Sequence, residues 1–252
     1  MARSAKNELP GRLLQRRLFE APPERVARLL LGKILVQRTK GCKPIAGRIV
    51  EVEAYLGPHS KTADQAAHSY RGPTPRNLVI FGPPGHAYVY SIYGRYYCMN
   101  VTCEREGRAG CILVRALEPV AGLELMARNR GLTGVSPSSQ KARKGWGTDA
   151  GLGPDGTCGK LRELTGGPSR LCQALGITRS AHNGVDLLDP KSPLQLRDDG
   201  IRAGRVAVTR RIGIRHAVEL PLRFIVAGNI CVSGPKSMAG TASFSVSIAS
   251  ID

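Results

Sequence analysis

Two runs of apolar residues near the start of the chain predict a β-hairpin that follows a short helix. Residues 33–38 and 47–56 are rich in apolar and β-branched side chains, and residues 41–44 between them contain glycine and proline. Such runs separated by turn residues are typical of paired antiparallel strands. Residues 22–31 instead repeat apolar side chains at helical spacing, after two prolines that a first helical turn accepts.

A second hairpin is predicted where five of the seven tyrosines gather, between residues 88 and 97. Residues 87–92 and 96–101 both alternate, and Tyr93-Gly94-Arg95 between them holds a glycine suited to a tight turn. The alternation therefore places Tyr93 near the tip of the hairpin. Residues 111–117 form the next expected strand.

The pattern is weaker in the second half of the chain. Apolar spacing predicts helices at residues 119–130 and around 171–175, and short strands at 206–214 and 222–226. The 252 residues show no internal repeat. We therefore expect a single α+β domain, with a curved, largely antiparallel sheet, short surrounding helices and a protruding hairpin.

Three segments differ in composition from this domain, which we expect to span residues 21–235. Residues 1–20 carry many charges with little periodicity and are expected to form a flexible basic arm. Residues 131–167 are rich in Gly, Ser, Thr, Pro and basic side chains, which indicates a surface insertion that is either a DNA-contacting arm or a solvated insert. Residues 236–252 are expected to form a weakly structured C-terminal tail.

The charge of the chain favours a polyanionic partner. Its 37 Lys and Arg against 19 Asp and Glu give a formal net charge of +18. Nucleic acid is the first candidate, because neutralising phosphates releases condensed counterions, and an anionic membrane surface is the second. A basic protein without such a partner is the alternative. No apolar run approaches the roughly 20 residues that span a bilayer, and no secretory signal is evident, so the cytosol or nucleoid is the expected location.

The cysteines give no indication of a metal or cofactor site. There are seven, an odd number, without a C-x-x-C pair or a histidine cluster at zinc spacing. Cys98, Cys103 and Cys111 lie close together in sequence, but no fourth ligand follows at the usual spacing. We expect reduced, mostly buried thiols, no metal and no cofactor.

A pair of carboxylates is the first candidate for chemistry. Period-two alternation over residues 47–57 places Glu51, Glu53 and Tyr55 on one face of the strand. Carboxylates on a surface that holds a polyanion oppose binding unless one of them takes part in a reaction, for which a general base is the obvious role. The alternative is a half-exposed strand whose glutamates pair with local arginines such as Arg48.

The tyrosine hairpin is the second candidate. An aromatic side chain at its tip, Tyr93, beside Arg95 resembles a wedge that enters a base stack and replaces an extruded nucleotide. Tyr90, nearer the root of the same strand, offers a flat face for a base. A tyrosine-rich core is the alternative, and it explains buried tyrosines better than one at the tip. Among polar residues nearby, Arg76 lies near the end of a rigid loop that suits either a phosphate contact or plain turn formation. Arg115 lies within a strand, where it needs a carboxylate or phosphate partner.

Taken in series, these motifs resemble the alkyladenine (3-methyladenine) DNA glycosylase family. The similarity covers about residues 20–130 and 165–228. The matching segments are Ile49 to Gly57, His68-Ser69, Thr74 to Asn77, Tyr88 to Tyr90, Ile92 to Gly94, Cys98 to Asn100, Arg115 to Pro119 and Gly167 to Leu175.

The resemblance implies a fold and a set of roles. The sheet would close into an open barrel, Glu53 would activate a water for attack on the sugar, and Tyr93 would intercalate. Tyr55, His68 and Tyr90 would sandwich the flipped base, and Asn100 would disfavour the amino group of guanine. Arg115 would hold the phosphate side of the flipped nucleotide, and the remaining expected DNA contacts are Arg76, Arg95 and Arg170.

The implied function is a monofunctional glycosylase of base excision repair. It would act on duplex DNA as a monomer, releasing alkylated or deaminated purines such as 3-methyladenine or hypoxanthine and leaving an abasic site. The location would be cytoplasmic and nucleoid-associated in a bacterium, or nuclear in a eukaryote. Two alternatives are a non-catalytic basic protein that binds damaged or distorted nucleic acid, and an RNA-binding module. Glu53 discriminates between them, because a binding protein has no use for a carboxylate there.

Overall fold

One strand, β3 (Ile45–Tyr55), organises the sheet. The computed structural model describes residues 9–39, 41–133 and 157–234. Along one edge, β3 pairs with β6 (Cys111–Ala121). Along the other edge it pairs first with β2 (Ile34–Gln37) and then, beyond residue 50, with β9 (Arg223–Val226). Register shifts between Ile49 and Val52 accompany this change of partner, as expected of a β-bulge that bends a strand.

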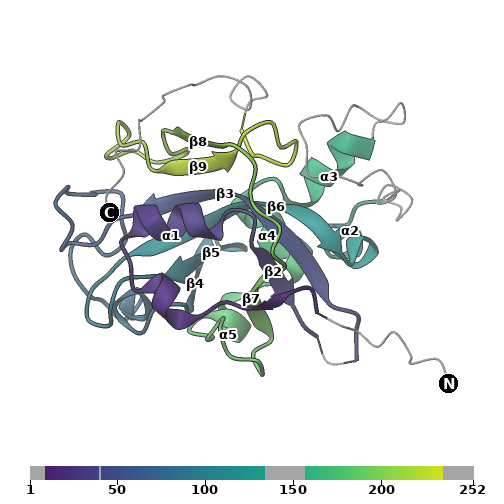
Figure 1. The fold of residues 1–252 in the computed structure, drawn as a ribbon, viewed down its shortest axis with the longest axis horizontal. Helices are drawn as coiled ribbons and strands as arrows, with labels where there is room; N and C mark the ends of the chain where they lie inside the picture. The colour runs from purple at the N-terminus through teal and green to yellow at the C-terminus, as the bar shows by residue number, and fades with distance from the viewer. Residues whose placement is uncertain (1–8, 40, 134–156, 235–252) are drawn as a thin grey trace.

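The remaining strands extend the sheet in both directions. The path runs β1-β7-β2-β3-β6-β5-β4, with β8 added beyond β9, and every pairing is antiparallel. The sheet lies within a single α+β domain, as the alternation predicts, and is curled into a half-barrel, as the family resemblance implies (Figure 1). The bounds of the other strands are β1 Arg12–Leu13, β4 Ala87–Ile92, β5 Tyr96–Thr102, β7 Leu194–Asp198 and β8 Val206–Thr209.

Short helices surround the sheet. Helix α1 (Pro23–Leu30) begins at a proline, as predicted, and packs on β3 and β6. Helix α4 (Pro168–Leu175) packs on β5, β6 and α2 and buries its apolar face in the main core. The other helices are η1 Arg16–Phe19, η2 Leu78–Phe81, α2 Leu123–Arg130, α3 Thr157–Thr165 and α5 Arg179–His182.

Both predicted hairpins are present as antiparallel pairs, β2 with β3 and β4 with β5. Strand β3 is not half-exposed, however. Its residues 45–54 are all buried, because α1 lies on it and β9 and the chain before β9 cover the segment that carries the glutamates. The alternation correctly placed Glu51 and Glu53 together, but it could not reveal that both faces of the strand are covered.

The prediction of a flexible arm over residues 1–20 is wrong for its described part. Residues 12–13 pair with β7, and Phe19 is fully buried in the core. Arg16 forms an ion pair of 2.6 Å with Asp186 and donates to a backbone carbonyl. Strand pairing depends on backbone groups, and the segment is anchored by one buried aromatic side chain. A charge-rich composition indicates neither.

The prediction of a surface insertion over residues 131–167 is wrong at its end. Helix α3 occupies residues 157–165, and Leu161 and Leu164 are buried in the main core. Residues 134–156, like the predicted tail at 236–252, lie outside the described residues. Two leucines three positions apart are enough to anchor a short helix, even within a Gly- and Ser-rich composition.

Three element boundaries also differ from prediction. The strand from Cys111 continues to Ala121, so the expected helix at 119–130 begins only at Leu123, after Gly122 at φ 77°. The strand expected over 206–214 ends at Thr209. Strand β7 was not predicted. No helix among the described residues is long and apolar enough to cross a membrane.

Candidate functional site

A pocket of about 540 Å³ opens where the β4–β5 hairpin, β6 and two loops meet. Most of the residues that the sequence singled out line it. Those residues are Tyr55, His68, Arg76, Tyr90, Tyr93, Asn100 and Arg115, and they are joined by Ala66, Tyr88, Ile92, Cys98, Cys111, Leu113, Pro168, Ile212, Gly213 and Ile214.

Aromatic rings form one wall of the pocket. The rings of His68 and Tyr90 lie 4.6 Å apart, edge to face, and Tyr88 lies 5.5 Å from Tyr90. The Tyr88 hydroxyl is 2.9 Å from Nδ1 of His68. Burial, followed by the positive charge of Arg76, lowers the pKa of His68, so this histidine is neutral at pH 7. The wall therefore offers uncharged faces on which a planar ring can stack.

Asn100 at the floor of the pocket is held in a fixed orientation. Its Nδ2 donates to the backbone carbonyl of Tyr88 at 3.1 Å, and its Oδ1 accepts from the Cys111 thiol at 3.8 Å. Burial raises the pKa of Cys111 to about 12, which keeps that thiol protonated as a donor. A fixed amide can discriminate between purines by the groups on their edges.

Glu53 lies directly behind the pocket wall. Its side chain is fully buried, and three lining residues contact its carboxylate. The Tyr55 hydroxyl donates to Oε2 at 3.0 Å, Arg115 donates to Oε2 at 3.3 Å, and the backbone N–H of Ile212 donates to Oε1 at 2.8 Å. An ionised carboxylate has about four acceptor positions, so these contacts leave room for one further donor.

Glu51 anchors the same cluster from below. Its Oε1 accepts from Arg115 at 3.0 Å and from Arg223 at 2.7 Å, and Ser233 donates to both of its oxygens. Although burial opposes it, the charges of Glu53 and Glu51 raise the pKa of Arg115. The alternative partner from the sequence, Arg48, instead pairs with Asp199 at 2.7 Å. Ion pairs to the glutamates do form, but with arginines distant in sequence.

A second buried ion pair braces the pocket from outside. Arg211 donates to both oxygens of Asp64, at 2.7 and 2.8 Å, and its guanidinium lies 4.6 Å from the centre of the Tyr55 ring. Asp64 also accepts from the backbone N–H of Leu56 at 2.9 Å. The pair thus joins the end of β3 to the loop whose next residue, Ile212, holds Glu53.

Tyr93 stands at the rim of the pocket, in the three-residue connection between β4 and β5. Its side chain is 90% exposed, and its φ of 49° lies in the left-handed region, which non-glycine residues adopt only under constraint. Gly94 follows with φ 73°. Arg95 lies over the ring of Tyr96 at 5.0 Å, and Arg76 lies 5.7 Å from the ring of Tyr90. The hairpin thus presents the ring of Tyr93 to solvent, and two other tyrosines of the same hairpin carry an arginine over their rings.

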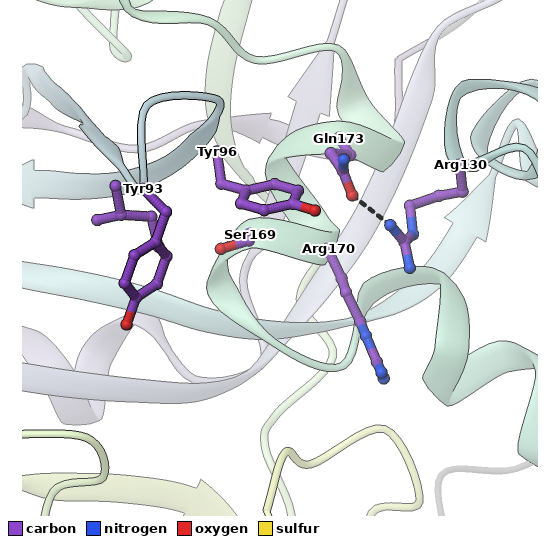
Figure 2. Close-up of a pocket in the computed structure, with 7 residues that line it drawn as sticks. Tyr93, Tyr96, Arg130, Ser169, Arg170 and Gln173 are labelled. Atoms are coloured by element: carbon purple, nitrogen blue, oxygen red, sulfur yellow. Dashed lines mark hydrogen bonds between the residues drawn. The ribbon is translucent and has the colours of Figure 1, made fainter.

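Arg170 does not line this pocket. It lines a neighbouring pocket that shares Ile92 and Tyr93 with the first (Figure 2). Arg115 lies inside the first pocket, where its guanidinium contacts both glutamates. Its expected contact with a nucleotide stays a prediction, as do the other roles inferred from the sequence.

The described residues hold no group of three or more His, Cys, Asp or Glu arranged for a metal ion. Six cysteines, at positions 42, 98, 103, 111, 172 and 231, are free thiols, and Cys42 alone among these six is exposed. The sequence did not indicate Asp64, Arg211, Arg223, Ser233 or the backbone of Ile212 as parts of the site. Asp64 lies in an irregular loop, and the others are distant from β3 in the chain or contribute a backbone group, so no periodic spacing marks them.

Comparison with known proteins identifies a family that matches most of this chain. A family model described as methylpurine-DNA glycosylase matches residues 17–230. A protein of Koribacter versatilis named "Putative 3-methyladenine DNA glycosylase" is 48% identical over 223 residues, which cover 88% of this chain and 94% of the relative. Proteins of the same name from Burkholderia lata (42% over 227 residues, 90% and 93% covered) and Methanoculleus marisnigri (44% over 219 residues, 85% and 95% covered) are also similar.

Proposed function

The chain belongs to the methylpurine-DNA glycosylase family and is a DNA glycosylase, and from this premise we propose that it flips alkylated or deaminated purines, including 3-methyladenine and hypoxanthine, out of duplex DNA. It then hydrolyses the bond between the base and the deoxyribose and leaves an abasic site. It acts as a monomer in the compartment that holds the chromosome.

The buried carboxylate behind the aromatic pocket carries this proposal. Tyr55, Arg115 and the Ile212 backbone hold Glu53 in one orientation with one acceptor position left for a water. Because Glu53 is fully buried, a water reaches it only when one of the lining groups shifts. Base entry provides the occasion for that shift, since Tyr55 both lines the pocket and covers Glu53.

The reaction balances without a further co-reactant. The water oxygen bonds to C1′ of the sugar, a proton of the water passes to Glu53, and the bond from C1′ to the purine nitrogen breaks. The electron pair of that bond goes to the base. A cationic alkylated purine leaves as a neutral molecule, whereas hypoxanthine must also gain a proton, and in the overall balance this is the proton that Glu53 takes from the water. The described lining contains no lysine, which favours attack by water over attack by an amine.

Recognition begins at the hairpin. An exposed tyrosine in a strained backbone conformation is what an intercalating wedge requires, and Tyr93 would fill the space that the flipped nucleotide leaves. Flipping costs a few kcal/mol, least for damaged bases, and stacking returns roughly 1–3 kcal/mol per base. The walls formed by Tyr55, His68 and Tyr90 would supply that stacking and would favour a cationic ring. Asn100 would exclude guanine through its amino group.

A second function is supported by one observation. All the charges around Glu53 are paired within the protein, as in a structural ion-pair network. A protein that recognises damaged or distorted DNA without cleaving it would have the same pocket and hairpin. In that case Glu53 would serve stability alone.

Single-turnover base release separates these functions. The substrates are a duplex with one hypoxanthine and a methylated duplex, each with enzyme in excess, and the variants are Glu53→Gln and the exposed control Glu106→Gln. We expect Glu53→Gln to lower the rate by roughly 10²–10⁴-fold with duplex binding unchanged, and Glu106→Gln to behave as wild type. Tight binding without release by the wild-type protein would establish the damage-binding function instead.

A further inference from the structure

A second pocket, of about 380 Å³, lies beside the first. Ile92 and Tyr93 line both, so the proposed wedge stands at their common border. Figure 2 shows the polar side chains of this pocket, which come from the hairpin and from two neighbouring helices, α2 and α4. Its other lining residues are Tyr96, Arg130, Ser169, Arg170 and Gln173. We call it the arginine pocket.

Among the described residues, the two arginines of this pocket form no ion pair with a carboxylate. Arg130 donates to the side-chain oxygen of Gln173 and to the backbone carbonyl of Glu163, at 3.3 Å for the latter. Within the part of the chain that the structure describes, neither Arg130 nor Arg170 forms an ion pair, and Nε of Arg130 is buried without an acceptor. Burial, and after it the charge of Arg170, lower the pKa of Arg130. The positive charge of Arg170 thus acts on Arg130, and the carboxylate of Glu163 offsets this effect only in part.

The start of α4 adds further donors to the same pocket. The helix begins after Gly167, which provides no side-chain cap, and its first residue is a proline without an N–H group. The next two N–H groups, of Ser169 and Arg170, find no acceptor among the described residues. Free N–H groups and the helix dipole both favour an anion at such an end.

We propose that the arginine pocket binds one backbone phosphate of the DNA, next to the nucleotide that Tyr93 displaces. Arg130 and Arg170 hold the phosphate from two sides, and Gln173 fixes the guanidinium of Arg130 toward it. The ligand is a phosphodiester rather than free phosphate, because the pocket borders the exposed wedge. This inference rests on the proposed function and adds to it a site that positions the duplex.

The first test compares Arg130→Ala with Arg128→Ala, an exposed arginine on the same helix. For Arg130→Ala we expect roughly tenfold weaker binding of a lesion duplex. We also expect a slope of log Kd against log salt that is smaller by about 0.9, the value for one phosphate contact. Equal behaviour of the two variants overturns the proposal.

The second test identifies the phosphate. Single neutral methylphosphonate linkages replace each phosphate within two nucleotides of the lesion, on either strand. At one position we expect wild type to lose as much affinity as Arg130→Ala does, and the variant to lose nothing more. Independent losses at every position overturn the proposal. The proposal is also overturned if inorganic phosphate stabilises the wild-type protein while the position of the neutral linkage has no effect on affinity, because that result indicates a site for free anions.

Two further variants keep the test decisive if Arg130→Ala folds poorly. Arg130→Lys retains the charge and should keep most of the salt slope, whereas Gln173→Ala releases the guanidinium and should cause an intermediate loss of affinity. If neither Gln173→Ala nor Arg130→Ala loses affinity, the proposal is contradicted. If wild type shows the phosphate dependence but releases no base, the proposed function fails and the phosphate site stands.

Discussion

The two pockets that share Tyr93 differ in how their charged side chains are paired. We call the larger one, in which Tyr55, His68 and Asn100 lie, the base pocket. Behind it, two glutamates and two arginines form a closed network, and Asp64 pairs with Arg211 beside it. In the arginine pocket, Arg130 and Arg170 have no ion-pair partner among the described residues. A chain with a net charge of +18 therefore keeps its base pocket close to neutral and leaves the positive charge beside the wedge.

This difference in charge pairing suits the base pocket to the reaction and the arginine pocket to DNA binding. Paired and hydrogen-bonded charges are pre-oriented, and a reaction in their midst requires little reorganisation. Unpaired cations at a surface contribute little to the stability of the protein but gain counterion-release free energy when a phosphate arrives.

Breaking the buried pair beside the base pocket should have the largest effect. Asp64→Asn preserves the shape of the side chain but leaves the Arg211 guanidinium buried without a counter-charge. We expect the free energy of unfolding to fall by about 3–5 kcal/mol, as measured by urea denaturation. Glu104→Gln breaks the pair with the half-exposed Arg108 and should change the free energy of unfolding by less than about 1 kcal/mol. Similar small losses in both variants would show that the inner pair is not a brace.

Removing the wedge should affect binding rather than stability. Tyr93→Ser deletes an exposed ring, so the folded protein loses few contacts. If the ring stacks in the duplex, lesion-duplex binding should weaken by about 5- to 150-fold, corresponding to 1–3 kcal/mol. Binding to single-stranded DNA should change far less. Tyr70→Ser removes a partly exposed tyrosine outside both pockets and serves as the control; equal losses on duplex and single strand would refute intercalation.

The smallest effect concerns protonation of the aromatic wall. Because the folded state lowers the pKa of His68 below its ordinary value of about 6.5, the unfolded chain binds more protons as the pH falls past that value. The stability contributed by neutral His68 is therefore present above about pH 6.5 and is lost as the pH falls further toward the folded pKa.

Replacing this histidine should flatten the pH dependence of stability. Between pH 7.5 and 5.5, the free energy of unfolding of His68→Gln should decline less than that of wild type. His182, whose pKa is also lowered by burial, remains in both proteins as a common background. The exposed His216→Gln variant should decline as wild type does. If the free energy of unfolding declines in parallel for all three proteins, protonation of His68 is not the cause of the acid sensitivity.

Local patterns in the sequence were sufficient for the parts of the site that lie on regular strands. Alternation placed Glu51 and Glu53 on one face, and Gly94 located the turn that exposes Tyr93. The resemblance to a known family then selected His68 and Asn100, which no local pattern distinguishes from structural residues. The structure brings all of these together at one pocket.

The supporting groups could not be predicted because they depend on long-range packing. Arg223 reaches Glu51 across 172 positions, and the Ile212 N–H reaches Glu53 across 159, from a segment that the sequence had assigned to a strand. The charge-rich first 20 residues concealed Phe19, whose burial required the rest of the core. Likewise, the arginine pocket forms only where α2 and α4 meet.

The most direct test measures affinity and single-turnover base release side by side for Glu53→Gln and Arg130→Ala on one lesion duplex. We expect opposite outcomes. Glu53→Gln should lose base release and keep its affinity, whereas Arg130→Ala should lose affinity and still release base when enzyme is in large excess. Base release by Glu53→Gln at the wild-type rate would contradict a catalytic role for Glu53.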